Sequence, residues 1–213
     1  MGSQLIPILV SKGYQTVALV RSGSESKLPA GCLIVTGNAL EGASYEAHVR
    51  PGDVFVHLVG VAHPGPGKER AFVEIDKRSA EEAIRVAASR GANHFVYVSV
   101  AQPAPVMKAY VDVRMQCESL IRQAGLAATI LRPWYVLGPG HRWPLILAPF
   151  YYLAEHIPAT RKGARRLGLV TIGQMAGALA AAVDSLPTNV RVLEVPDIRE
   201  SARTQIAHAR TSS

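Results

Sequence analysis

Residues 1–21 read MGSQLIPILVSKGYQTVALVR and place a helical pattern directly before a strand pattern. Within residues 4–12 the apolar side chains recur at helical spacing, and Gly13 follows as a residue that commonly ends a helix. Residues 16–21 form a short apolar run that is typical of a buried strand. A helix that feeds such a strand normally crosses over from an earlier parallel strand. We therefore expect the first strand of the fold to be missing from this sequence.

Strand and helix patterns continue to alternate after this opening stretch. Continuous apolar runs predict further strands at residues 33–36, 54–59, 95–100 and 128–132. Helical spacing predicts a weak helix and two strong ones, at residues 40–49, 70–89 and 108–123. Strands that are apolar throughout are typical of a parallel sheet buried on both faces by helices. The sequence therefore predicts an α/β fold with a doubly wound, Rossmann-like parallel sheet.

The C-terminal third of the chain is less regular. Residues 138–200 are expected to form a small subdomain on the substrate side of a single domain that covers residues 1–200. Its expected elements are two helices and one strand, at residues 145–155, 173–184 and 190–195. Residues 201–213 are polar and show no periodicity, so we expect a flexible tail there.

The charge pattern limits the kinds of ligand that suit the chain. Its formal net charge is +7, but the basic residues are scattered, and the dense cluster at 161–166 contains no aromatic residue that could stack on bases. This pattern argues against nucleic acid and suits an anionic ligand such as a phosphorylated cofactor. The histidines show no zinc-ligand spacing with Cys or Glu, so no metal site is predicted.

No stretch of the sequence predicts a membrane-spanning segment. The apolar residues 145–154 are interrupted by Pro149 and cover about half the length that a bilayer requires. They could instead form a lid over a substrate pocket or a surface for a protein partner. Cys32 and Cys117 lie far apart in the sequence, and their simplest interpretation is free thiols in the reducing cytoplasm.

Ligands of an open parallel sheet bind at the carboxyl ends of its strands. That rule selects a set of residues that follow the predicted strands and that we expect to line one crevice. Together with the family resemblance described below, it predicts these cofactor contacts: Arg21, Ser22, Asn38, Ala39, Leu58, Val59, Gly60, Val100, Pro133 and Tyr135.

Arg21 is the most informative of these positions. An acidic residue at the end of this strand binds the ribose hydroxyls of NAD, whereas an arginine favours the 2′-phosphate of NADP. The reason is that guanidinium is a permanent cation with a forked set of donors. The alternative is an exposed arginine that merely ends a strand. We predict NADP as the cofactor, with NAD as the alternative.

Several stretches together resemble one family. They are LIPILVSKGYQTVALVRSGS, DVFVHLVGVAH, GANHFVYVSV and YVDVRMQCESLIRQAGLAATILRPWYVLGPG, with a weaker likeness in LGLVTIGQMAGALAAAV. Over residues 2–140 the chain is similar to atypical short-chain dehydrogenases/reductases, and most similar to the NmrA-like, NAD(P)-binding group. The resemblance implies an NAD(P)-binding protein. One implied function is NADPH-dependent reduction of a small carbonyl substrate, and the other is non-catalytic cofactor sensing or an accessory role in assembly.

The resemblance also implies a glycine-rich turn, GxxGxxG, whose amides cradle the cofactor pyrophosphate. Only Gly2 matches it, as the last glycine, so the sequence lacks the first strand and most of this turn. A truncated form of a longer reductase would explain this departure. Asn38 stands where relatives often carry an aspartate that contacts adenine, and an amide can still hydrogen-bond to a base.

A Tyr-x-x-x-Lys pair is the second feature that the resemblance implies. Here it reads Tyr110-Val-Asp-Val-Arg114, which places both side chains on one face of a helix. In active relatives the tyrosine exchanges a proton with the substrate carbonyl, and the lysine lowers its pKa and holds the nicotinamide ribose. Tyr110 and Arg114 are therefore the candidate catalytic residues. Arg114 in place of lysine, and Ala101 in place of a frequent Ser or Thr, favour the non-catalytic alternative.

Overall fold

The opening stretch folds as its pattern predicts. The structure is a computed structural model that describes residues 1–62, 64–104, 106–138 and 167–211. Helix α1 covers Gly2–Ser11 and buries Leu5, Ile6 and Leu9, and strand β1 covers Val17–Val20. Gly13 adopts a φ of 83° in the turn between them, a left-handed conformation that glycine reaches without steric cost.

All strand pairs of the structure are parallel, which confirms the predicted fold class. Four strands form one sheet in the order β3-β4-β5-β8. Their bounds are Val54–His57 for β3, His94–Val98 for β4, Ala128–Leu131 for β5 and Val190–Leu193 for β8. The crossovers between parallel strands place the helices on the two faces of this sheet.

Strand β1 belongs to a separate sheet. It pairs with β2 (Leu33–Thr36) to form two strands in parallel register, Val17 opposite Leu33. Within the part of the chain that the structure describes, no ladder joins β1 or β2 to β3. The predicted single crevice is therefore divided between the carboxyl ends of two sheets, because none of the described strands bridges them.

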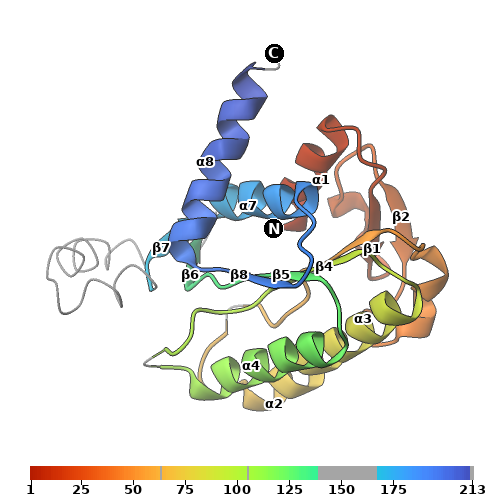
Figure 1. Cartoon of the computed structure of the whole chain (residues 1–213). Coiled ribbons are helices and arrows are strands. Elements are labelled where there is room, and N and C mark those ends of the chain that lie inside the picture. Colours follow the sequence, from red (N-terminus) through yellow and green to blue (C-terminus); the bar gives the residue numbers. More distant parts are fainter. Residues whose placement is uncertain (63, 105, 139–166, 212–213) are drawn as a thin grey trace, which may run out of the picture.

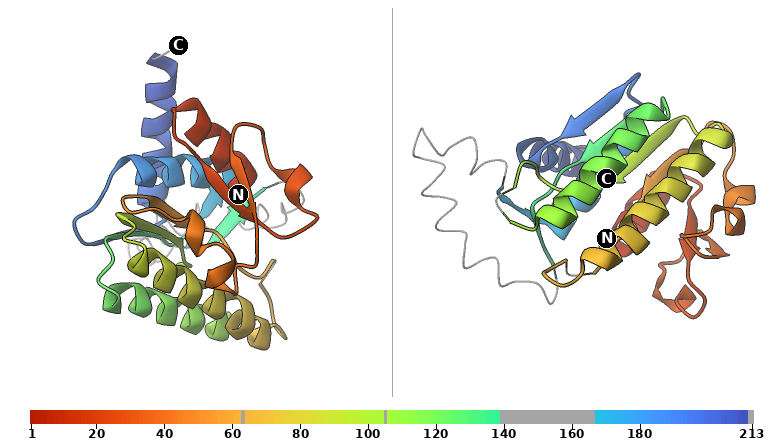
Figure 2. Two further views of the ribbon diagram at one scale, coloured as in Figure 1. Left: turned by 90° about the vertical axis from the view of Figure 1, so that its right-hand side faces the viewer. Right: turned by 90° about the horizontal axis from the view of Figure 1, so that it is seen from below.

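The helices lie in two layers, one on each face of the four-stranded sheet (Figure 1). One layer holds α1, α7 (Ile172–Asp184) and α8 (Val195–Thr211). The other holds α4 (Lys108–Gln123) beside a continuous helical run, seen in front of the strands in the right-hand view of Figure 2. That run consists of α2 (Glu69–Ala71), the π-helical segment η4 (Phe72–Lys77) and α3 (Arg78–Ser89).

Each layer has its own apolar core. Leu5 and Leu9 of α1 pack with Met175 and Leu179 of α7 and with Val96 on one face of the sheet. The opposite face is covered by the helices of the second layer. Its core is formed by Phe72, Ala80, Ala83, Ile84, Ala87, Phe95, Tyr97, Val113, Cys117, Ile121, Ala128 and Ile130. The apolar strands are thus buried on both faces, as their composition predicts.

The helix predicted at residues 40–49 does not form. The segment contains two 3₁₀ turns instead, η2 (Gly42–Ser44) and η3 (Glu46–His48); a third turn, η1 (Glu25–Lys27), follows β1. The Ser44 hydroxyl donates to the Asn38 and Glu41 carbonyls, and this side-chain bonding competes with helical hydrogen bonds.

The C-terminal region corrects a second expectation. Residues 201–211, predicted as part of a flexible tail, continue helix α8. Ala202 is buried against Gly177 of α7, where an added Cβ would lie 3.2 Å from the Ala202 Cα, so the missing side chain allows this close contact. Strands β6 (Tyr135–Leu137) and β7 (Leu169–Thr171) form a small parallel pair. The helix predicted at 145–155 lies outside the described residues.

Candidate functional site

The carboxyl ends of the central strands lie side by side and are joined by backbone hydrogen bonds. The Ala101 N–H donates to the Pro133 carbonyl at 2.9 Å, just beyond β4 and β5. The Ser99 N–H donates to the Leu131 carbonyl at 2.7 Å. Of the predicted contacts here, Val100 and Pro133 are buried, so they offer backbone more than side chain to a ligand.

The N-terminus of α1 lies at the carboxyl end of β3. A Cβ added to Gly2 would lie 3.8 Å from Leu58 Cδ1, so the predicted contacts Gly2 and Leu58 are neighbours. The first turn of α1 contains no acidic residue that would compete for its free amides. The positive end of the helix can therefore receive a phosphate. Leu58 and Val59 are half-buried and Gly60 is exposed.

Arg21 and Ser22 directly follow β1, and both are exposed. Among the described residues, no carboxylate forms an ion pair with Arg21. The guanidinium is thus available to an anionic ligand at the carboxyl end of the two-stranded sheet. Both residues follow a strand, as predicted, but that strand belongs to a different sheet from β3, which Leu58 follows.

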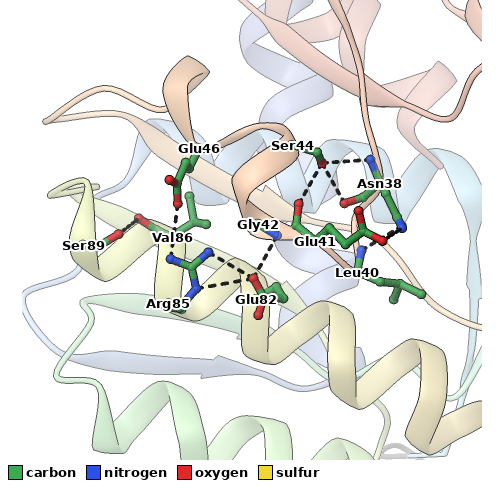
Figure 3. A network of polar contacts seen from close by, with 10 residues as sticks. All are labelled: Asn38, Leu40, Glu41, Gly42, Ser44, Glu46, Glu82, Arg85, Val86 and Ser89. Atoms are coloured by element: carbon green, nitrogen blue, oxygen red, sulfur yellow. Dashed lines mark hydrogen bonds and ion pairs between the residues drawn. The ribbon is translucent and has the colours of Figure 1, made fainter.

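Asn38 already uses both polar groups of its side chain, as Figure 3 shows. Its Nδ2 donates to Glu41 Oε1 at 2.8 Å, and its Oδ1 accepts the Leu40 N–H at 3.0 Å. A contact with adenine would have to use the second hydrogen of Nδ2 or the second lone pair of Oδ1. The geometry favours a loop-forming role for Asn38, and the half-buried Ala39 follows in the same turn.

A polar network that the sequence analysis did not identify ties this loop to α3. Glu82 Oε2 accepts the Gly42 N–H at 2.8 Å and an Arg85 N–H at 3.1 Å (Figure 3). Arg85 also pairs with Glu46 at 3.2 Å. The network holds the segment after β2 against the helical layer, so the position of Asn38 depends on α3.

Tyr110 lies in α4 and is half-buried in its helical layer. Its ring packs against Phe72, with 5.0 Å between the centroids, and the Arg114 guanidinium carbon lies 5.1 Å from its ring centroid. Burial raises the pKa of Tyr110, although the charge of Arg114 opposes that effect. Tyr110 and Arg114 are thus brought together as the spacing predicts.

Arg114 forms a buried ion pair with Asp76 of η4. The two side chains are 6% and 0% exposed. Arg114 Nη1 donates to the Val98 carbonyl at 2.9 Å and to the Tyr97 hydroxyl at 3.1 Å. Asp76 Oδ2 accepts the Val61 N–H at 2.9 Å. The pair therefore connects the segment after β3, through Val61, with the end of β4, through Val98.

Burial and the neighbouring groups shift the pKa values of Asp76 and Arg114 in opposite directions. Burial raises the pKa of Asp76, while Arg114 and the Val61 N–H lower it. Burial alone would lower the pKa of Arg114, but Tyr97, Tyr110 and Asp76 together raise it above its usual value. Arg114 consequently stays protonated and cannot itself exchange a proton with a substrate.

Ser99 is also engaged internally. Its Oγ donates to Glu118 Oε1 at 2.6 Å, and Arg132 donates to the same carboxylate at 2.9 and 2.6 Å. Glu118 is 2% exposed. The arrangement stabilises the ends of β4 and β5 and leaves Ser99 poorly placed to act on a ligand. Ala101 is buried as well.

The sequence analysis missed Asp76 and Glu118, although a signal for both was present. Asp76 lies four residues after the buried Phe72, and Glu118 lies four residues after Arg114. Each carboxylate therefore falls on the buried side of its helix. Tyr135, the last predicted contact, lies in β6 with its ring 5.2 Å from that of Trp134.

Within the described ranges, no group of three or more His, Cys, Asp or Glu side chains could hold a metal ion. Among the same residues, no helix is both long and apolar enough to cross a membrane.

The chain belongs to a family of NAD(P)H-binding proteins, whose sequence model matches residues 1–141. This match confirms the NAD(P)-binding resemblance and the dinucleotide-binding character of the fold. No curated protein matches the chain.

Several solved structures share the fold of this chain. WbmH from Bordetella bronchiseptica, solved with NAD+, is 17% identical with a TM-score of 0.67 over 98% of this chain and 77% of that one. UDP-glucose 4-epimerase from Thermus thermophilus, solved with NAD, is 16% identical with a TM-score of 0.62 over 98% and 79%. A nucleoside-diphosphate-sugar epimerase from Staphylococcus aureus is 14% identical with a TM-score of 0.63 over 91% and 67%. At these identities the likeness shows the fold alone.

Proposed function

We propose that this chain binds NADP(H) along the carboxyl ends of its strands without catalysing a Tyr110-dependent reduction. The observation that carries this proposal is the ion pair between Arg114 and Asp76, whose side chains are 6% and 0% exposed. A cation that serves a Tyr-x-x-x-Lys site has to reach the cofactor ribose. Among the described residues, Arg114 hydrogen-bonds to Asp76, Tyr97 and Val98, and its guanidinium also interacts with Tyr110.

The residues at the strand ends fit the phosphates of the cofactor. Arg21 is exposed and has no ion-pair partner among the described residues, which supports a contact with the 2′-phosphate, since its forked donors match a phosphate group. The N-terminus of α1 at Gly2 supports a contact with the pyrophosphate, because the first amides of a helix lack intrahelical partners and no acidic residue lies in the first turn. Bound NADPH would supply a hydride, but Tyr110 is packed against Phe72 and its pKa is raised by burial.

Cofactor binding is tested by titrating the protein with NADPH and following nicotinamide fluorescence. We expect saturable binding, and an absence of binding at millimolar cofactor would refute the proposal. Arg21→Glu should weaken NADPH about tenfold or more and leave NADH unchanged, because only NADPH carries the 2′-phosphate. Arg203→Glu, which changes an exposed arginine of α8, serves as the matched control.

The second half of the proposal is tested with Tyr110→Phe. This variant removes only the hydroxyl, so NADPH binding should stay the same, and any slow oxidation of NADPH by small aldehydes and ketones should continue at the same rate. Turnover in the unchanged protein that disappears in Tyr110→Phe would instead establish the alternative, an NADPH-dependent carbonyl reductase.

A further inference from the structure

The Asp76–Arg114 pair occupies an unusual position for a buried ion pair. It lies directly beneath the loop after β3, where the Arg114 Nη2 and the Asp76 carboxylate occupy the space that a Cβ on Gly60 would need. Gly60 itself is exposed. The backbone of this glycine therefore lies between the guanidinium and the outer surface at the strand ends.

Under the proposed function, the position of this pair decides which half of the cofactor it faces. Arg21 at the end of β1 would hold the adenosine phosphate, and the N-terminus of α1 beside Leu58 would hold the pyrophosphate. A dinucleotide extended along the carboxyl ends then places its nicotinamide half beyond β3, toward β4. Gly60 and the buried Arg114 lie in that direction, since Arg114 donates to Val98 at the end of β4.

The two redox forms of the nicotinamide ring differ by one charge. The oxidised ring carries a positive charge and the reduced ring is neutral, while the phosphates are the same in both forms. An uncompensated guanidinium beneath Gly60 would repel only the oxidised ring, because like charges interact strongly where solvent is excluded. A carboxylate paired with that guanidinium removes most of the repulsion.

Asp76 is the carboxylate that provides this compensation. Within the described part of the chain, no other carboxylate contacts the Arg114 guanidinium. Glu118, one turn further along α4, is already bound by Arg132, Ser99 and Gln102. Loss of the Asp76 charge would therefore leave Arg114 without a counter-ion.

We propose that Asp76 is a positioning residue that sets the preference between oxidised and reduced cofactor by neutralising Arg114 beneath Gly60. This inference rests on the proposed function and goes beyond it, because it assigns a determinant of redox-state selectivity. Asp76 acts through Arg114 and does not touch the cofactor.

The test is the ratio of two dissociation constants, that of NADP+ divided by that of NADPH. NADPH is measured by fluorescence titration and NADP+ by competition against it at the same ionic strength. Asp76→Asn keeps an oxygen that can accept the Val61 N–H but removes the charge, so the ratio should rise about tenfold. A general loosening of the fold would weaken both cofactors and leave the ratio unchanged.

Two further variants separate charge from structure. The double variant Asp76→Asn/Arg114→Met removes both charges and should return the ratio to its original value. Arg114→Met alone removes the cation that lowers the pKa of the buried Asp76, so this carboxyl should ionise only at alkaline pH, and the ratio should fall there below its original value. This pH-dependent shift keeps the proposal testable if Asp76→Asn fails to fold. The control is Asp112→Asn, a partly exposed carboxylate of α4 paired with Lys108, which should leave the ratio unchanged.

The outcomes are distinct from those of the proposed function. If the unchanged protein binds neither form of the cofactor, the proposed function fails. If it binds both but the folded Asp76 and Arg114 variants keep the original ratio, or both shift it in the same direction, the role of Asp76 is overturned.

Discussion

The four-stranded sheet and the sheet of β1 and β2 differ sharply in how well their apolar residues are covered. In β4, Phe95, Val96 and Tyr97 are all 0% exposed. In β2, by contrast, Leu33 is 59% exposed and Ile34 is 43% exposed. The strands have similar composition, so the difference lies in their neighbours. Strand β4 has a paired strand on each side and a helical layer on each face, whereas β2 pairs with β1 alone.

The candidate site therefore has two parts, one on the well-packed four-stranded sheet and one on the more exposed two-stranded sheet. The strand ends near Gly60, Val98 and Pro133 belong to the four-stranded sheet and are joined by ion pairs and backbone hydrogen bonds. Arg21 projects from the two-stranded sheet. We expect local opening to begin at β1 and β2, because regions with few buried contacts open at lower free energy.

The largest effect should come from the core of the four-stranded sheet. Phe95→Ala should lower the free energy of unfolding by about 3–5 kcal/mol, since it removes a large side chain from a fully buried position. Leu33→Ala in β2 should cost less than about 1 kcal/mol, because more than half of that side chain is already exposed. Urea denaturation of both variants measures the difference. Equal losses would contradict the contrast between the sheets.

A fall in pH should destabilise the protein through two histidines of the same four-stranded sheet. Burial lowers the pKa of His57 from 6.5 to about 3, and that of His94 to about 4. Both histidines are neutral in the folded protein and gain a proton on unfolding below pH 6.5, so their contribution to stability is lost as the pH falls from about 6.5 toward 3.

His57→Phe tests this pH dependence. The unchanged protein should lose up to about 2 kcal/mol through His57 between pH 7 and pH 5, and the variant should lack that part of the loss. Urea midpoints at the two pH values give the comparison. His48→Gln, at an exposed histidine of η3, should keep the full loss. A variant that loses as much stability as the unchanged protein would exclude His57 as the cause.

A smaller effect should follow from the cap of α7, which covers the four-stranded sheet. Thr171 Oγ1 accepts the Gln174 N–H at 3.1 Å, and Gln174 Oε1 accepts the Thr171 N–H at 2.9 Å. Thr171→Ala should therefore cost about 1 kcal/mol, and Thr171→Ser should retain most of that stability. Thermal unfolding followed by circular dichroism measures both, and an equal loss in the two variants would argue against the capping role.

Much of the local structure could be predicted from the sequence. The helix at 108–123 and the strand at 33–36 have the predicted bounds, because continuous apolar runs and helical spacing are properties of neighbouring residues. The predictions for residues 40–49 and 201–211 were wrong because side-chain contacts overrode these local patterns. Side-chain bonds of Ser44 replaced a helix in the first case, and the contact of Ala202 with α7 extended one in the second.

The candidate site was predicted less completely than the fold. Helical spacing was enough to place Tyr110 and Arg114 on one face of α4. It could not identify the partner of Arg114, since Asp76 is 38 residues away and lies in another helix. Nor could it show that Asn38 is bound by its own loop.

The sequence by itself determined most of the order of strands and helices and the parallel sheet, and it predicted the strand ends as the place for a ligand. Period and apolar content act over a few residues, so they can be read without knowing the packing. Only the tertiary structure decided that the strands form separate sheets and that Arg114 is neutralised by Asp76 beneath Gly60. Those features depend on contacts between residues far apart in the chain, and such contacts arise only when the helical layers pack against the strands.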